Sequence, residues 1–361
     1  MVIRKNIKSL TDNQKQNFVK AILKLKEAQS QLHVYDNDAN RYDDYVETYL
    51  ISFHSISRTS PNSDPNWYPG WGHNGPAFFP WHRSFLLQFE KDLQKVSNDP
   101  DIAIPYWDWT DKVPDASPFT EDFMGGDGVG KQGEVLNGPF AYDGPNNWTL
   151  KITHSSHKQE APVSMNFLRR QLGNGKASHL PKSGEVEKIL KIVEYDKSPW
   201  KLTTRSKGFR PEVEYALSNL VHRYVNGCMA TITAPNDPVF WLHYSNIDRL
   251  WALWQQKNRE SFPYCPVGGG YNGHNLHDTL LYHEPRFPPP WNKTYTPLDL
   301  LYHVKLGYSY DTDQNEVLFT SHSKYIKLSK IPKESRVASL FYNFPVMKDV
   351  SKFSHGPQVE K

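Results

Sequence analysis

Apolar residues recur every three or four positions in several stretches of the chain, and this spacing predicts amphipathic helices. The first helix is expected after Thr11 and Gln14, which have the spacing of a capping box, with apolar residues over positions 18–23 on one face. A second helix is expected over about residues 76–96. His82 falls on the apolar face of this second helix, so its side chain is predicted to point into the protein.

Two further helices are expected in the second half of the chain. One begins near Pro211 and places Ser218 and His222 one turn apart on the same side. The other has Asp237 as its expected N-cap and Pro238 at its first helical position, and it continues through a run of large apolar residues. The pattern therefore predicts a mainly α fold, in which helices are joined by long polar loops.

The long segments between these helices are rich in glycine, proline and polar residues, which suits a binding pocket walled by loops. They cover residues 57–75, 110–147 and 263–293. After about residue 312 the pattern changes to short alternating runs that are typical of strands. We therefore expect one helical domain over residues 1–312, and a short C-terminal extension over residues 313–361 rather than a second domain.

Composition and charge exclude several classes of function. The chain has 361 residues with 42 basic and 39 acidic side chains, and no dense basic stripe that would suit nucleic acid. No apolar run is long enough to cross a membrane, and the first ten residues lack the pattern of a secretory signal, so the default expectation is a cytoplasmic protein. The two cysteines, Cys228 and Cys265, cannot form a disulfide framework.

Three histidines in the first third of the chain are candidate metal ligands. His73 and His82 are expected at the end of a loop and inside a helix, while His54 follows an apolar stretch, residues 49–53, that itself has the pattern of a helix. A lone buried histidine is usually structural, but three on converging elements indicate a metal site. Neutral imidazole is a favoured ligand of copper, so a site of this kind can hold copper.

Several motifs give the chain a specific resemblance to the tyrosinase and catechol oxidase family, most closely to the short bacterial tyrosinases. They are HNGPAFFPWHRSFLLQFEKDL at 73–93, PYWDWT at 105–110 and APNDPVFWLHYSNIDRLWALW at 234–254. The resemblance extends over about residues 1–312. It implies a four-helix bundle that holds two facing copper ions, each bound by three histidines, with dioxygen between them. The positions that match the first copper's ligands are His54, His73 and His82.

The same resemblance implies that the second copper site has changed. The family's His-x-x-x-His pair reads Ser218 and His222 here, so the first ligand is missing. The family's last ligand is the second member of a His-His doublet, which reads His243 and Tyr244 in this chain. Only His222 keeps its place, and His243 corresponds to the member that supports the site without binding metal.

Two interpretations of Tyr244 remain open. It could bind a weaker or modified second metal together with His222, or lend an electron to the site. Alternatively, it fills the vacated space and hydrogen-bonds Ser218 or a water, which is the favoured interpretation and leaves one copper ion. A single copper disfavours ortho-hydroxylation of monophenols and leaves oxidation of catechols or aminophenols by dioxygen. Two other pairs, His154 with His157 and His274 with His277, are expected to face solvent.

Further residues match family positions near the substrate. Glu214 corresponds to a glutamate that orients a water near the second copper, and Asn219 to the asparagine that assists it, so the two could take a proton from a phenol. Capping and solubility explain the same residues equally well. The loop that lines the family's pocket corresponds to Met229, Thr231 and Ile232 here.

The sequence thus favours a copper-dependent oxidoreductase that acts on small aromatic molecules with dioxygen. A non-oxidative metal-binding relative on the same fold is the first alternative. The second is a zinc enzyme whose three-histidine site activates water. Oligomeric state cannot be deduced from these patterns.

Overall fold

The computed structural model describes residues 1–53, 70–113, 116–153, 166–174, 177–200, 208–282 and 294–313. Helices dominate this part of the chain, which confirms the predicted mainly α class. The α-helices are α1 (Asp12–Glu27), α2 (Arg41–Ile51), α3 (Phe78–Ser97), α4 (Ser183–Leu190), α5 (Phe209–Glu212), α6 (Asn219–Val225) and α7 (Val239–Lys257). The predicted extension falls almost wholly outside the described residues.

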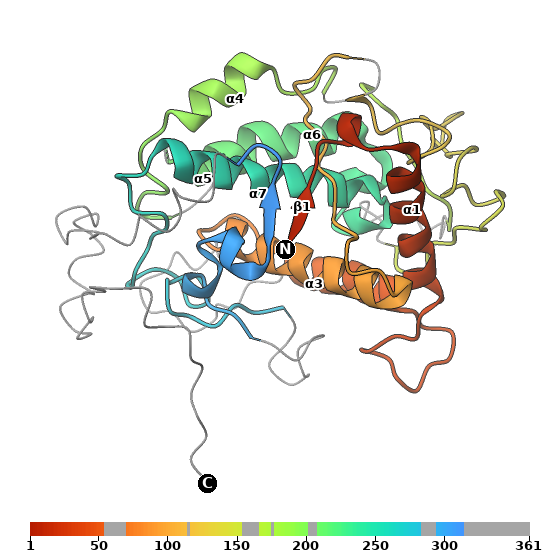
Figure 1. Ribbon diagram of the computed structural model, residues 1–361, viewed down its shortest axis with the longest axis horizontal. Helices are drawn as coiled ribbons and strands as arrows, with labels where there is room; N and C mark the ends of the chain where they lie inside the picture. Colours follow the sequence, from red (N-terminus) through yellow and green to blue (C-terminus); the bar gives the residue numbers. More distant parts are fainter. Residues whose placement is uncertain are drawn as a thin grey trace, which may run out of the picture.

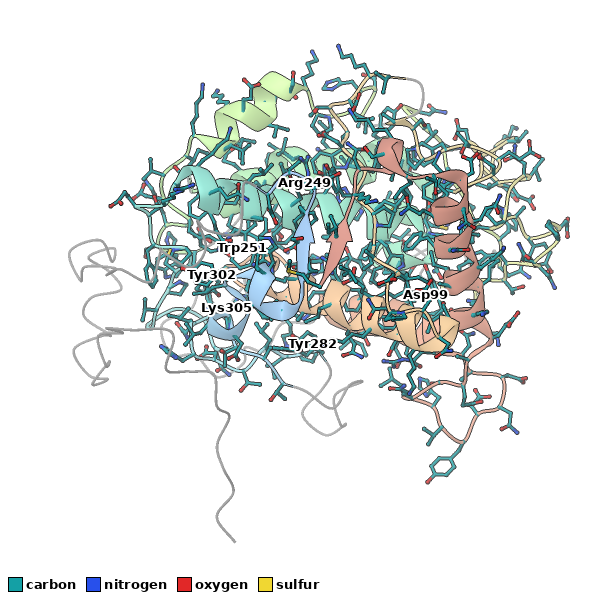
Figure 2. All side chains as sticks on the ribbon, in the orientation of Figure 1. Asp99, Arg249, Trp251, Tyr282, Tyr302 and Lys305 are labelled. Atoms are coloured by element: carbon teal, nitrogen blue, oxygen red, sulfur yellow. The ribbon has the colours of Figure 1, made fainter. Side chains whose placement is uncertain are left out.

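The centre of the fold is the contact between α3 and α7. Figure 1 shows α3 running across the molecule below α7, with α1 along one end and α4 at the outer edge. Phe89 of α3 stacks on Trp241 of α7 with ring centroids 3.5 Å apart. Trp251 of α7, labelled in Figure 2, packs against Phe79 and lies under the guanidinium of Arg83. Aromatic side chains from both helices therefore fill the core and fix the two helices that carry most of the site.

The first helix forms as predicted. Thr11 accepts a hydrogen bond from the amide of Gln14, and the Gln14 side chain accepts one from the amide of Thr11, which completes the capping box. Phe18 and Ile22 are buried on the face that packs against α3. Burial of this apolar stripe holds α1 to the bundle, since a helix of this length is marginal by itself.

The predicted helix near Pro211 is not a continuous α-helix. Residues Phe209–Glu212 are α-helical, Val213–Ser218 form a π-helical segment, and Asn219–Val225 return to α-helical geometry. A π segment adds a residue to the turn, and such segments often occur at functional sites. Both Glu214 and Ser218 lie within it.

Two predicted helix boundaries also differ from the structure. The helix expected over 49–53 ends at Ile51 and Ser52 is its C-cap, so Phe53 lies in the turn that follows. At the start of α7 the first helical residue is Val239, and Asp237 still accepts a hydrogen bond from the Val239 amide. Asp237 is also fully buried in an ion pair with Arg170, which ties the start of α7 to the loop before α4.

A short parallel pair of strands connects the two ends of the domain. Strand β1 (Val2–Arg4) pairs with β2 (Tyr308–Tyr310), and the strands lie side by side in Figure 1. Arg4 is fully buried, where its guanidinium contacts Glu90 of α3 and Asp248 of α7. The first residues of the chain are therefore bound into the core beside both central helices.

Two findings concern expectations about cysteines and membranes. Cys228 and Cys265 are both free and buried, as expected for cysteines that form no disulfide framework. None of the helices in the described residues is long and apolar enough to cross a bilayer.

Candidate metal centre

Two of the three predicted first-site histidines lie together in the core. His73 precedes α3 and His82 lies within it, with ring centroids 5.0 Å apart and planes nearly perpendicular. The third, His54, lies outside the described residues. Within the described ranges, the first site therefore consists of two histidines, His73 and His82. No group of three histidine, cysteine or acidic side chains in those ranges is arranged around a metal position.

The hydrogen bonds of His73 and His82 leave one nitrogen of each ring available. His82 Nδ1 lies 2.7 Å from the carbonyl of Phe78, and His73 Nδ1 lies 3.1 Å from the hydroxyl of Ser52. Each Nε2 atom is buried and has no hydrogen-bond partner among the described residues. Burial lowers the pKa of His82 to about 3 and that of His73 well below its usual value. Both imidazoles are therefore neutral, which is the form that binds metal.

Aromatic rings pack against this buried pair. The ring of Phe53 stacks on His73 with centroids 3.9 Å apart, and Tyr49 contacts His73 edge-on at 5.0 Å. Such packing fixes the orientation of each imidazole, as a rigid metal site requires. We call His73 and His82, with the expected His54, the first site.

The residues predicted at the second copper position also come together, and we call Ser218, His222, His243 and Tyr244 the second site. His222 Nδ1 lies 2.6 Å from the carbonyl of Met229, which leaves Nε2 as the nitrogen for a ligand. That Nε2 lies 3.2 Å from the hydroxyl of Tyr244. His243 Nε2 lies 3.1 Å from the hydroxyl of Ser218. Burial lowers the pKa of His222 to about 4.

Tyr244 lies between the two sites. Its ring is parallel to that of His82, with centroids 4.1 Å apart, and its hydroxyl lies 3.2 Å from the hydroxyl of Tyr49. Ser218 also hydrogen-bonds the Tyr244 side chain. Burial raises the pKa of Tyr244 above its usual value, so the side chain is a neutral phenol.

Glu214 is a buried carboxylate with a partner on each of its two oxygens. One carboxylate oxygen accepts a hydrogen bond of 2.6 Å from the amide of Asn74, and the other lies 2.7 Å from the guanidinium of Arg210. Burial raises the pKa of Glu214, and the nearby Arg210 opposes that shift. Asn219 is half-buried at the start of α6. Glu214 thus connects the π segment to the residue that follows His73.

The predicted pocket residues lie directly after α6. Met229 is fully buried, while Thr231 and Ile232 are half-buried. The Met229 carbonyl is the partner that fixes the orientation of the His222 ring. Sequence patterns do not indicate this role, because it belongs to the backbone. The Thr231 hydroxyl donates to the carbonyl of Cys228, which closes this short loop on itself.

The expectation that His274 faces solvent was wrong. His274 is fully buried, and its Nδ1 accepts a hydrogen bond of 3.1 Å from the amide of Ala77 at the start of α3. Since Ala77 offers no side-chain cap, His274 satisfies one of the free amides at this helix end. His277 is exposed as expected, and His154 and His157 lie outside the described residues.

Comparisons with known proteins agree with this geometry. The family model described as the common central domain of tyrosinase matches residues 39–257. A tyrosinase from Streptomyces antibioticus is 40% identical over 86% of this chain and all of its own length. A grixazone synthase from Streptomyces griseus is 33% identical over 86% of this chain and 99% of its own.

Solved structures share the fold at lower identity. A polyphenol oxidase from Thermothelomyces thermophila has a TM-score of 0.61 at 20% identity, covering 86% of this chain and 88% of its own. A functional unit of octopus hemocyanin has a TM-score of 0.51 at 20% identity, covering 86% of this chain and 68% of its own. These likenesses confirm the predicted helical bundle.

Proposed function

The chain belongs to the tyrosinase family, and from this premise we propose that it is a copper-dependent oxidase with one intact copper site. Members of the family use copper and dioxygen to oxidise phenolic substrates. We propose that the substrates here are catechols or aminophenols rather than monophenols. The observation that carries this proposal is a contrast between Nε2 atoms: those of His73 and His82 have no partner among the described residues, whereas those of His222 and His243 are hydrogen-bonded.

The first site fits copper. Buried polar atoms are almost always hydrogen-bonded, so two unpartnered Nε2 atoms on facing neutral imidazoles need a ligand. His73 and His82 would hold the ion, with His54 as the third ligand that the sequence implies. Bound copper supplies one-electron exchange with dioxygen and an aromatic substrate.

The second site fits a metal poorly. His222 Nε2 is the one nitrogen left at a position that matches a family ligand, and it already has the Tyr244 hydroxyl as a partner. Ser218 and His243 are likewise bonded to each other. A phenol with a raised pKa is also a weaker ligand than imidazole, since it must lose its proton to bind. We infer that this set holds no second copper of comparable affinity.

The remaining residues position the site. Met229 holds His222 in one tautomer through its carbonyl, and Glu214 fixes the backbone beside His73. Because both carboxylate oxygens of Glu214 are occupied, we propose a positioning role for it rather than proton abstraction. Thr231 and Ile232 are proposed to contact the substrate, and Asn219 to assist in orienting a water near the site, as their family positions suggest.

Metal analysis with electron paramagnetic resonance tests the proposal. Protein loaded with excess cupric salt and then desalted should hold one copper per chain, with a full cupric signal, because an isolated cupric ion is paramagnetic. It should oxidise catechols or aminophenols and leave monophenols unchanged. Two coppers per chain with a silent spectrum would show a coupled pair and reject the proposal. Preferential uptake of zinc, or full copper loading without oxidation, would favour the non-oxidative alternatives.

A further inference from the structure

Two buried phenols lie beside the first site, and their hydroxyls face each other. Tyr244 and Tyr49 are each 2% exposed, and their oxygens are 3.2 Å apart. Tyr49 contacts His73 edge-on, and Tyr244 stacks on His82 with planes only 2° apart. Each phenol thus contacts a proposed copper ligand, at distances where an electron passes readily between aromatic rings.

Tyr244 also has a proton acceptor. The Met229 carbonyl engages His222 Nδ1 at 2.6 Å, so Nδ1 carries that ring's proton and Nε2 is an open acceptor. The Tyr244 hydroxyl lies 3.2 Å from this Nε2. A phenol is oxidised far more easily when its proton moves to a neighbouring base as the electron leaves. Tyr244 therefore has a path for its electron, through the stacked ring of His82, and an acceptor for its proton, His222 Nε2.

We propose that Tyr244 is a second one-electron redox centre, which takes over the electron-storing role of the absent second copper. This inference rests on the proposed function, because it needs a single copper at the first site. With copper held by the first site, the oxidised protein would carry Tyr244 as a phenoxyl radical whose proton resides on His222 Nε2.

The electrons and protons balance over one turnover. A catechol loses two electrons and two protons and becomes an ortho-quinone. With copper bound, one electron would pass to the metal, and the other would reduce the Tyr244 radical, which would recover its proton from His222. One substrate proton would pass to His222 Nε2 and the other to solvent. Dioxygen would then take both electrons, the proton held by His222 and one proton from solvent, and would leave as hydrogen peroxide. The Tyr244 proton would move to His222 as the radical forms again. No oxygen atom enters the ring, so monophenols are not hydroxylated.

The test counts electrons and detects the radical. Protein with one copper per chain is oxidised with hexachloroiridate, desalted, and titrated with a one-electron reductant. We expect two electrons per chain for the natural protein and one for Tyr244→Phe. In zinc-loaded protein the same oxidation should give a radical signal that narrows when ring-deuterated tyrosine is incorporated, because zinc has no redox chemistry.

Tyr45→Phe is the matched control. Tyr45 is also buried and its hydroxyl has a nearby base, Asp92 at 2.6 Å, but its ring packs on Phe85, Phe89 and Trp241. This variant should keep both electrons and the radical signal. If Tyr244→Phe retains two electrons, or if Tyr45→Phe loses one, the inference is wrong even with copper at one per chain. Two coppers per chain would instead overturn the proposed function on which it rests.

Discussion

Glu214 accepts a hydrogen bond of 2.6 Å from the amide of Asn74, the residue that follows His73. Its other oxygen lies 2.7 Å from Arg210. The π segment thereby brings a buried carboxylate to the backbone of the first site, across a separation of 140 residues. A mutation of Glu214, in the second half of the chain, should therefore affect copper that is bound at the first site.

Replacing Glu214 should both destabilise the protein and loosen the copper. Glu214→Ala removes one partner of a buried ion pair and should cost about 3 kcal/mol in the free energy of unfolding. Glu214→Gln keeps an acceptor for the Asn74 amide and should cost about 1–2 kcal/mol. Urea unfolding measures the first effect, and the rate of copper loss to a chelator measures the second. Equal copper loss from Ala and Gln would contradict the role of the Asn74 bond.

The double change Ser218→His and Tyr244→His should restore a second copper. It returns imidazole to both family positions and removes the phenol that occupies His222 Nε2. We expect copper to rise from one to two per chain, the paramagnetic signal to fall as the ions couple, and oxidation of monophenols to appear. Ser218→His alone is the control, since Tyr244 would remain. A double variant that still binds a single copper would indicate that the bundle itself, not these two positions, limits the second site.

The sequence predicted the helices because these depend on local patterns. The capping box of Thr11 and Gln14 and the inward face of His82 follow from spacing along one helix. The positions of Ser218 and Tyr244 followed from motif register, and the structure brings them to His243 and His222 as that register implies.

What the sequence missed are contacts between distant segments. The burial of His274 depends on a helix end nearly 200 residues earlier, and no periodicity in its own loop indicates this. The π segment was also not predicted from the sequence. Its extra residue changes the spacing of the apolar residues too little to be recognised. The stacking of Tyr244 on His82 needs the relative placement of α3 and α7, which only the packed core provides.

Acid should destabilise the metal-free protein through its buried neutral histidines. Burial lowers the pKa of His82 and of His274 to about 3, whereas an unfolded histidine has a pKa near 6.5. Between these values the unfolded chain binds more protons than the folded one, so stability falls as the pH drops below about 6.5. Each such histidine contributes up to about 1.4 kcal/mol per pH unit.

Urea unfolding of metal-free protein from pH 7 to pH 4 measures this slope. His274→Asn keeps an acceptor for the Ala77 amide and cannot be protonated. The slope of the unfolding free energy against pH should therefore become shallower, by the amount that corresponds to roughly one proton fewer taken up on unfolding. His179→Asn is the control, because His179 is an exposed histidine. A slope that His274→Asn leaves unchanged would mean that His274 is already protonated in the folded protein.

The ion pair of Arg170 and Asp237 should be the most sensitive polar contact at the start of α7. Both side chains are completely buried, two bonds of 2.7 Å join them, and Arg170 also donates to the carbonyls of Met124 and Gly125. Asp237→Ala leaves the guanidinium without its counter-charge and should cost about 3–5 kcal/mol in unfolding free energy. Arg170→Met leaves the Asp237 carboxylate and those carbonyls without their hydrogen-bond donor. Its cost in unfolding free energy should therefore be at least as large. The double variant removes both buried charges and should cost clearly less than the two single changes added together. Strict additivity in urea unfolding would show that the two charges do not stabilise each other.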